Sequence, residues 1–350
     1  MNKFHQEPLV SFLTPVYNGA EHLEVAIKSV LAQTYDNWEY VIVNNCSNDD
    51  SLEIIEHYAQ QDERIKIHNN NRFWELMPGL NHAFKQISDK STYCKVVHAD
   101  DWLFPECAQR MVEIGEAHPN AGIVGSYCLD GEEVTLDGLA YPSEITSGRK
   151  ICRRFFFEGL YLFGYPSSLL IRSALIRKRD RVYDESHLHG DLSAYFDILE
   201  ESDFGFVHQV LTFTRRHEGS QTSNSVINKF STYRLGSFKA LVNHGPDFLN
   251  EKEMEHLLAR DLDEYYRFLA RKFYELETAD FWDYHSSELK SLGLPLKYPK
   301  LAGFIVIELL NPRMTLGRLK QALKDRFFKP QSARGYRTFR TSPELQPQDT

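Results

Sequence analysis

The sequence predicts an α/β protein, with a mostly parallel, Rossmann-like sheet flanked by helices and a mainly helical C-terminal extension. Three observations support this class. Short apolar runs alternate with segments of helical periodicity through residues 9–97, which is the pattern of parallel βα units. Residues 121–214 mix strand and helix signals, and residues 228–328 are largely helical. At 350 residues with 42% hydrophobic side chains, the chain is long enough for two domains or for one large domain with an appendage.

The predicted strands are apolar runs that end at polar residues or proline, and the predicted helices carry apolar side chains on one face. Asn18 and Glu21 form a capping-box pattern before the first helix. The predicted strands are residues 9–13, 39–43, 65–67, 93–97, 123–127, 168–171 and 206–213. The predicted helices of this part are residues 23–31, 52–59, 79–87 and 192–199. Because helical crossovers join such strands, we expect helices on both faces of the sheet.

The amino-acid composition indicates the cellular compartment of the protein and excludes one kind of binding partner. The net charge of −9 argues against a nucleic-acid binder. The five cysteines are scattered without a CxxC spacing, which argues for a reducing compartment and against a zinc site or a disulfide framework. No secretory signal pattern is visible, and the longest apolar stretch, residues 301–310, is too short to span a membrane. We therefore expect a cytoplasmic protein.

The most informative segment is residues 95–105 (KVVHADDWLFP), where an apolar strand runs into Asp100 and Asp101. Ligands of open α/β sheets bind just outside the carboxyl ends of strands. Two adjacent carboxylates there repel each other unless a cation neutralises them, and hard divalent ions prefer carboxylates together with substrate phosphates. The segment therefore indicates a metal–diphosphate site. The alternative is that these residues cap the N-terminus of a helix.

Four segments in order resemble the family 2 glycosyltransferases, whose fold is called GT-A. They are residues 10–18 (VSFLTPVYN), 29–35 (SVLAQTY), 41–49 (VIVNNCSND) and 98–105 (HADDWLFP). The match covers residues 8–125 and weakens through residue 220. The resemblance implies an inverting, metal-dependent transferase. Its donor would be a nucleoside-diphosphate sugar, with a UDP-sugar expected, and its acceptor a hydroxyl of a glycan or lipid-linked sugar.

The resemblance assigns residues to the donor nucleotide. Pro15 and Tyr17 would line the base and ribose. Asn44 stands where the family has an aspartate that reads the base, and it keeps a carbonyl acceptor. The alternative for Asn44 is that it caps its own turn. Asn81 is expected to face the nucleotide, although Leu80 stands where an arginine is common.

The family's Asp-X-Asp metal motif begins at His98 in this chain. His98 would bond a ribose hydroxyl or a phosphate, or else end the strand with a satisfied side chain. Asp100 falls on the position that binds Mn²⁺ or Mg²⁺, and Asp101 would help to hold the ion. The segment after the last predicted strand resembles the family's closing loop. There Arg216 would neutralise the diphosphate and His217 would approach the metal, the alternative being two surface charges.

Residues 189–196 resemble the family's later acidic motif, and Asp191 falls on the position of the catalytic base. The reaction needs such a group because the acceptor hydroxyl must lose its proton as it attacks the anomeric carbon. Gly190 stands where a second acid is common. The alternative for Asp191 is a helix cap.

Two other classes of protein are weighed against the transferase. A catalytically silent protein of the same fold that binds a sugar nucleotide or a glycan is the alternative, because Asn44, His98 and Gly190 depart from the family pattern. A nucleotidyltransferase would usually carry a glycine-rich phosphate loop after the first strand, and residues 15–19 lack one.

The expected domain boundaries follow the strength of the resemblance. Residues 1–225 would form the GT-A domain, with its nucleotide-sugar part at residues 8–125 and its acceptor part at 126–225. Residues 226–329 would form a helical region, and the polar residues 330–350 a disordered tail.

The basic segment near the end of the chain leads to a first test. Residues 313–340 carry nine Lys or Arg residues against one acid, and residues 315–328 have amphipathic helical spacing. Such a helix can lie on the inner face of an anionic membrane, or it can pack against residues 304–307 or a second copy of the chain. A membrane contact predicts that anionic vesicles sediment the full-length protein better than a version ending at Asn311. Equal sedimentation contradicts that contact.

Overall fold

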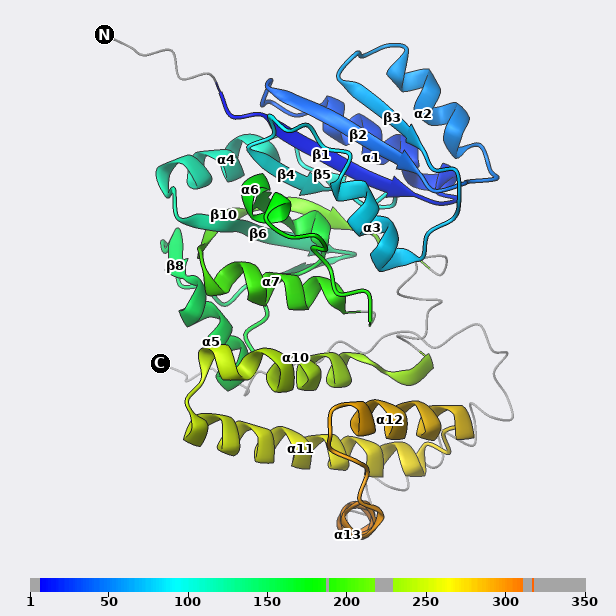
Figure 1. Ribbon diagram of the computed structural model, residues 1–350, viewed down its shortest axis with the longest axis vertical. Helices are drawn as coiled ribbons and strands as arrows, with labels where there is room; N and C mark the ends of the chain where they lie inside the picture. The colour runs from blue at the N-terminus through cyan, green and yellow to red at the C-terminus, as the bar shows by residue number, and fades with distance from the viewer. Residues whose placement is uncertain (1–6, 187–188, 218–228, 311–316, 318–350) are drawn as a thin grey trace, which may run out of the picture. The chain divides into compact units, whose positions relative to one another are not determined.

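The structure is a computed structural model in which residues 7–186, 189–217, 229–310 and 317 are described (Figure 1). The chain divides into two compact units, with the boundary between Leu262 and Asp263. The predicted basic segment lies outside the described residues except for Gly317, and the predicted tail at residues 330–350 lies entirely outside them.

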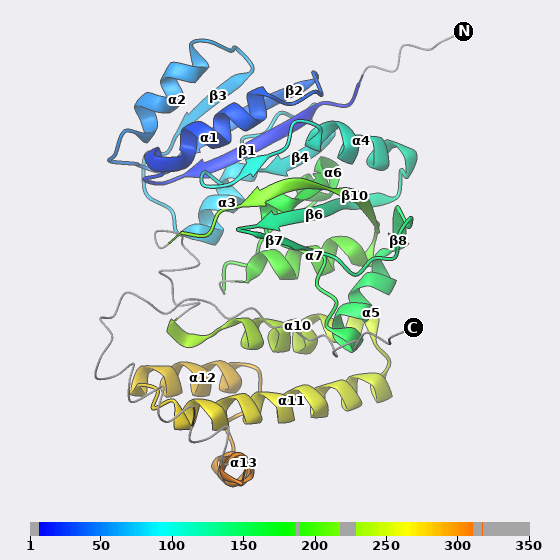
Figure 2. The same cartoon turned by 180° about the vertical axis from the view of Figure 1, so that it is seen from behind.

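The first unit is built on a sheet that comprises ten strands among the described residues. Its order is β3-β2-β1-β4-β9-β6-β10-β5, with β7 attached to β6 and β8 to β10. Pairing is parallel from β3 to β4 and between β6 and β10, which lie side by side in Figure 2; the other pairs are antiparallel. The strands are β1 Val10–Val16, β2 Trp38–Asn44, β3 Ile65–Asn69, β4 Tyr93–Val96, β5 Trp102–Leu103, β6 Ala121–Asp130, β7 Glu133–Thr135, β8 Ile145–Ser147, β9 Leu169–Arg172 and β10 Asp203–Thr214.

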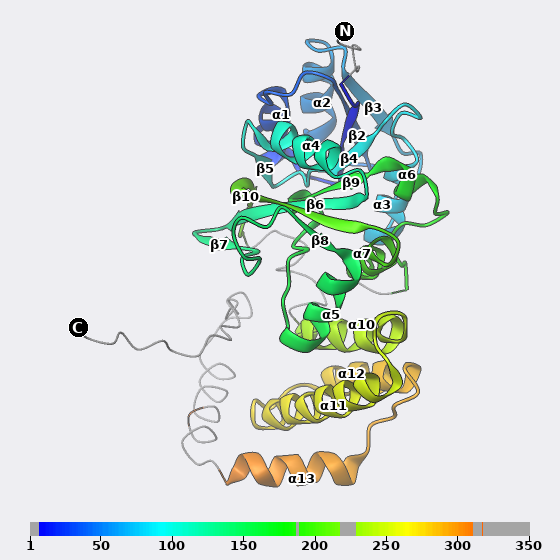
Figure 3. The same ribbon diagram turned by 90° about the vertical axis from the view of Figure 1, so that its left-hand side faces the viewer.

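Helices cover both faces of this sheet, as expected (Figure 3). One face packs against α1 (Ala20–Leu31), α2 (Ser51–Ala59) and α4 (Cys107–Ala117). The opposite face packs against α3 (Leu76–Phe84), α5 (Gly148–Glu158), α6 (Ser173–Arg177) and α7 (Gly190–Glu200), and α10 (Tyr233–Phe248) packs in turn on α5 and α7. Strands covered on both faces need apolar side chains in both directions, which explains the continuous apolar runs of β1 and β2. The predicted α/β class is confirmed.

The start of the first helix differs from the prediction. The predicted capping box at Asn18 is wrong. Helix α1 begins at Ala20 and its N-cap residue is Gly19, which has no side chain to cap the helix. Asn18 instead accepts the backbone N–H of Asn48 at 2.8 Å, and the N–H of Ala20 donates to Asp49 Oδ2 at 3.0 Å. The first helix therefore receives its cap from the loop after β2, a contact that local spacing does not reveal.

The second unit is helical. The end of α11 (Glu251–Tyr274) leads into α12 (Ala279–Ser291) and α13 (Tyr298–Leu309). Its buried side chains include Tyr265, Leu269, Phe281, Leu289 and Leu301. Among the residues that the structure describes, no helix is both long enough and apolar enough to cross a membrane.

Candidate active site

The parallel register brings three strand ends to one edge of the sheet. Val16 of β1 lies opposite Asn44 of β2, and Leu13 of β1 lies opposite Val96 of β4. The Thr14 hydroxyl donates to the carbonyl of Val97 at 2.6 Å, which carries the alignment one residue beyond the ladder. The loops that follow β1, β2 and β4 therefore leave the sheet together, at the edge where open α/β sheets bind ligands.

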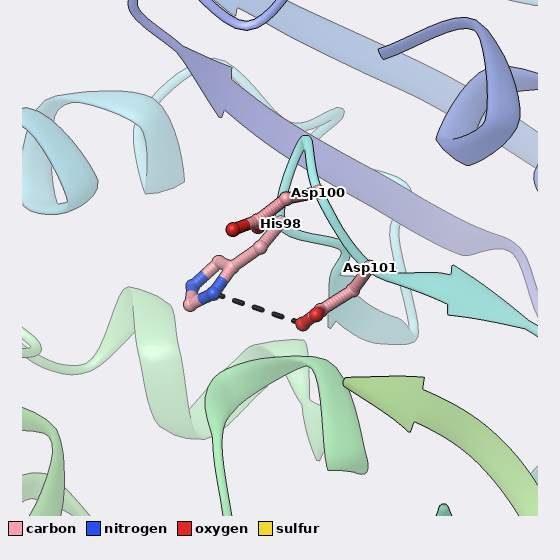
Figure 4. Close-up of side chains that lie close together, drawn as sticks. All are labelled: His98, Asp100 and Asp101. Carbon is pink, nitrogen blue, oxygen red and sulfur yellow. Dashed lines mark ion pairs between the residues drawn. The ribbon is translucent and has the colours of Figure 1, made fainter. Parts of the chain in front are cut away.

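The loop after β4 is a tight turn that gathers the predicted metal-binding residues (Figure 4). The N–H of Asp101 donates to the carbonyl of His98 at 3.1 Å. One ligand atom each from His98, Asp100 and Asp101 lies within 4.8 Å of the others, and His98 Nδ1 is 3.9 Å from Asp101 Oδ2. The helix-cap alternative for the two aspartates is wrong, because β5 follows them and α4 begins only at Cys107.

This turn has the donors that a divalent cation requires. Asp101 is 2% exposed; its Oδ1 accepts the N–H of Arg215 at 3.2 Å, while its Oδ2 has no hydrogen-bond partner within the described parts of the chain. His98 Nε2 is likewise buried and unpartnered there. Burial raises the pKa of Asp101 to about 6, the Asp100 charge adds to the rise, and His98, the Ser167 hydroxyl and the Arg215 N–H oppose it. Unpartnered buried acceptors beside a second carboxylate fit a hard cation.

The segment after β10 closes over this turn. His217 Nε2 lies 3.0 Å from Asp100 Oδ2, and the Arg215 guanidinium donates to the carbonyl of Asp100 at 3.1 Å. Arg216 pairs with both oxygens of Asp130 and donates to Tyr165 Oη at 2.8 Å. The structure thus brings His217 to Asp100, whereas Arg216 is engaged by a carboxylate at the end of β6.

The predicted base-binding residues lie on either side of the β1 end. Tyr17 is 45% exposed and its ring centroid is 4.8 Å from that of Phe73, while Pro15 is half-buried. Asn44 is 4% exposed; its Oδ1 accepts the N–H of Ser47 at 3.0 Å and its Nδ2 donates to Asn69 Oδ1 at 3.1 Å. Asn44 therefore does cap its own turn, and a role in reading the base stays a prediction.

Asn81 has a structural task that the sequence did not indicate. Its amide nitrogen donates to the carbonyl of Tyr183 at 2.8 Å and to Glu185 at 3.0 Å, and its oxygen accepts the N–H groups of Val182 and Tyr183 at 3.0 and 2.8 Å. The amide is thus saturated by the segment that precedes α7. Contact of Asn81 with a nucleotide stays a prediction.

Asp191 lies in the first turn of α7, where its Oδ1 accepts the N–H of Leu192 at 2.9 Å. Burial raises the pKa of Asp191 to about 6, while the Leu192 N–H and the nearby His98 oppose the rise. Burial raises the pKa of the Tyr183 and Tyr195 hydroxyls, and the Asp191 charge adds to the rise. A half-buried carboxylate with a raised pKa has the character of a general base near neutral pH.

Several residues of the site were not predicted as such. They are Asp130, Tyr165, Ser167 and His22, whose ring packs edge-on against that of His217 at 4.8 Å. A signal existed for two of them, because residues 164–167 (GYPS) have turn composition. Their partners lie at least 51 residues away along the chain, so only the fold reveals the contacts.

Comparisons with known proteins agree with this architecture. The profile of glycosyl transferase family 2 matches residues 11–180. An uncharacterized glycosyltransferase of Rickettsia typhi is 31% identical over 232 residues, covering 65% of this chain and 69% of that protein. EpsH of Bacillus subtilis, also named as a glycosyltransferase, is 33% identical over 272 residues, covering 74% of each.

Solved structures show the same fold. S. aureus TarS 1–349 in complex with UDP-GlcNAc has a TM-score of 0.62 at 14% identity and covers 91% of each chain. The mannosyltransferase PcManGT from Pyrobaculum calidifontis, in complex with GDP-Man and Mn²⁺, has a TM-score of 0.50 at 14% identity, with 93% of this chain and 89% of that chain covered. The fold is therefore GT-A. The chain belongs to glycosyl transferase family 2 and is a glycosyltransferase.

Gly190 provides a test of the packing beneath the candidate base. A Cβ at this position would lie 2.1 Å from the carbonyl oxygen of Asp184, and backbone cannot move aside cheaply. We predict that Gly190→Ala lowers the free energy of unfolding by about 1–3 kcal/mol through overpacking, measured by urea denaturation. Gly79→Ala is the matched control, because its Cβ would meet only ordinary contacts at 3.5 Å or more in α3. Equal stability of the two variants contradicts the packing argument.

Proposed function

We propose that this glycosyltransferase is inverting and metal-dependent, and moves a sugar from a nucleoside-diphosphate sugar to a hydroxyl of a glycan or lipid-linked acceptor. The observation that carries the proposal is the turn with His98, Asp100 and Asp101 at the carboxyl end of β4. Support comes from the structural neighbours, which were solved with UDP-GlcNAc or with GDP-Man and Mn²⁺.

The donor would lie along the edge where β1, β2 and β4 end. Tyr17 offers an exposed ring to the base or ribose beside Pro15. His98 keeps Nε2 for a ribose hydroxyl or a phosphate oxygen, because its Nδ1 faces Asp101. Asn44, engaged by Ser47 and Asn69, would offer the base only the remaining lone pair of its carbonyl oxygen. A UDP-sugar is the proposed donor.

Asp100 and Asp101 would hold a Mn²⁺ or Mg²⁺ ion, with His217 beside Asp100. Such an ion, when bound, neutralises the diphosphate and stabilises it as a leaving group. The protein's own contribution is to keep two carboxylates side by side. The Arg215 N–H fixes Asp101 and the His217 ring fixes Asp100. Arg216 would neutralise the diphosphate by exchanging its present pairing with Asp130 for the phosphate oxygens.

Asp191 would accept the proton of the acceptor hydroxyl as that oxygen attacks the anomeric carbon. A pKa of about 6 leaves the carboxylate largely ionised at pH 7 while keeping it basic enough to take the proton. A single displacement with one base inverts the configuration, because the hydroxyl attacks from the face opposite the diphosphate.

The proposed organisation of the chain follows the same lines. Residues 1–225 would be the GT-A domain, with the acceptor part beginning near residue 126, and residues 226–329 a helical region. A cytoplasmic location, a membrane contact through residues 313–340 and a homodimer are part of the proposal, and the vesicle experiment above bears on the membrane contact.

Donor binding tests the proposed metal site directly. We predict that UDP with Mn²⁺, at a hundredfold excess over its Kd, stabilises the wild-type protein by about 2.7 kcal/mol in thermal unfolding. Asp100→Asn should lose the gain that Mn²⁺ adds, because a carboxylate is replaced by a neutral amide. Asp89→Asn, an exposed change before the amino end of β4, is the control and should keep it. If Mn²⁺ stabilises Asp100→Asn as fully as the wild type, Asp100 does not bind the metal. Repeating the measurement with GDP in place of UDP tests which nucleotide base the site prefers.

The catalytic base is tested by rate and by pH. Asp191→Asn should lower kcat by about 10²- to 10⁴-fold at unchanged donor affinity, because the amide cannot take the proton. In the wild type, kcat at saturating substrates should fall as pH decreases through about 6, since protonation of Asp191 removes the base. Glu200→Gln, an exposed change on α7, should leave the rate and profile unchanged. A wild-type rate in Asp191→Asn would mean that the base is another group, and a total lack of turnover in the wild type would favour the catalytically silent alternative.

A further inference from the structure

A lysine is buried in the strand that leads to the candidate metal site. Lys95 is 0% exposed within β4, and its Nζ donates to the carbonyls of Ser167 at 2.8 Å and of Leu169 at 3.3 Å. A buried ammonium group is unfavourable unless hydrogen bonds replace its hydration, and burial lowers the pKa of this lysine. Both carbonyl partners belong to one short stretch, the 3₁₀ turn η1 (Pro166–Ser168) and the start of β9. Lys95 therefore anchors that stretch against β4.

The anchored turn reaches the loop after β4 through the Ser167 hydroxyl. Ser167 is 0% exposed, and its Oγ accepts the backbone N–H of His98 at 3.0 Å. Two residues before Ser167, Tyr165 accepts a hydrogen bond from Arg216. The stretch from Tyr165 to Ser167 thus touches both the turn after β4 and the segment after β10.

The Ser167 hydroxyl accepts a backbone N–H that the pairing of β4 with β9 does not reach. On the β1 side, the ladder continues past the end of β4, because the N–H of Val97 donates to Leu13 at 2.9 Å. On the β9 side, the pairing includes only Tyr93 and Cys94 of β4. The N–H of His98 therefore lies beyond the β9 ladder, and this part-buried backbone donor needs another partner. Ser167 Oγ is that partner, at the first residue of the turn that carries the carboxylates.

We propose that Ser167 is a positioning residue that sets the orientation of the His98–Asp101 turn for the metal–diphosphate group, and that Lys95 holds Ser167 in place. The inference rests on the proposed function. Removing the hydroxyl frees the first residue of the turn and so misplaces the carboxylates, while the carbonyl bonds from Lys95 remain.

Ser168 makes a matched control possible. It follows Ser167 in the same turn and is equally buried, but its Oγ has no hydrogen-bond partner in the described structure. We expect Ser167→Ala to weaken Mn²⁺-dependent binding of UDP by about 10- to 100-fold, the usual effect of losing a group that orients metal ligands. Binding of UDP without metal should not change. Ser168→Ala should alter neither, and isothermal titration with circular dichroism melting gives affinity and stability for each variant.

Each outcome decides a different point. If the two alanine variants bind Mn²⁺–UDP alike, or if Ser167→Ala weakens UDP equally with and without Mn²⁺, the positioning role is overturned. If the wild type binds neither Mn²⁺–UDP nor Mn²⁺–GDP, the proposed function itself fails.

The role of Lys95 is read from a double-mutant cycle. Lys95→Met keeps an unbranched side chain that is one atom shorter, and it removes both carbonyl bonds. If Lys95 acts through Ser167, the effect of Ser167→Ala on Mn²⁺–UDP affinity should shrink to less than threefold in the Lys95→Met background. If the two substitutions instead weaken Mn²⁺–UDP binding by factors that multiply in the double variant, Lys95 does not act through Ser167. If Lys95→Met does not fold, Lys95→Arg keeps a donor in the strand and should bind Mn²⁺–UDP more tightly than Ser167→Ala does; weaker binding overturns the link.

Discussion

The parallel pairing of β1 with both β2 and β4 is the constraint on which the candidate site depends. Because the three strands are aligned as Leu13–Val96 and Val16–Asn44, their carboxyl ends reach the same edge. The loops after β1 and β2 then bond each other, as Asn18 does with Asn48, and the turn after β4 lies beside them. A shift of one residue in this register would send every side chain of the shifted strand to the opposite face of the sheet. The apolar cores on both faces oppose such a shift.

Two departures from the family pattern have a physical explanation in this fold. Asn44 stands where the family has an aspartate, and it uses an amide hydrogen that a carboxylate lacks to donate to Asn69. The neighbouring Asn45 likewise donates to the carbonyl of Trp74 at 2.7 Å. The pair holds together the loops after β2 and β3. Gly190 stands where an acid is common because the backbone of Asp184 occupies the space of a side chain. The departures therefore have structural roles of their own, and they do not by themselves indicate a loss of chemistry.

Burial and hydrogen bonding have opposite effects on the pKa values of two carboxyl groups of the candidate site. Asp101 and Asp191 both have a pKa raised to about 6 by burial, yet each accepts one backbone N–H, from Arg215 and Leu192. These bonds favour the ionised forms that a metal ion or an acceptor proton would require. His98 lies close enough to influence both groups, so one imidazole lies near both carboxylates.

The sequence by itself determined the α/β class, the positions of the main strands along the chain and the place of Asp100 just after a strand, because these features follow from local periodicity and from how strands terminate. It did not predict α5, whose apolar residues are interspersed with Arg and Lys, nor β5, which has only two residues. Tertiary structure alone decided that Asn81 holds the segment before α7, that Arg216 pairs with Asp130, and that Lys95 and Ser167 reach the turn after β4. These contacts join residues 69 to 102 positions apart, and a local pattern carries no record of which distant groups folding brings together.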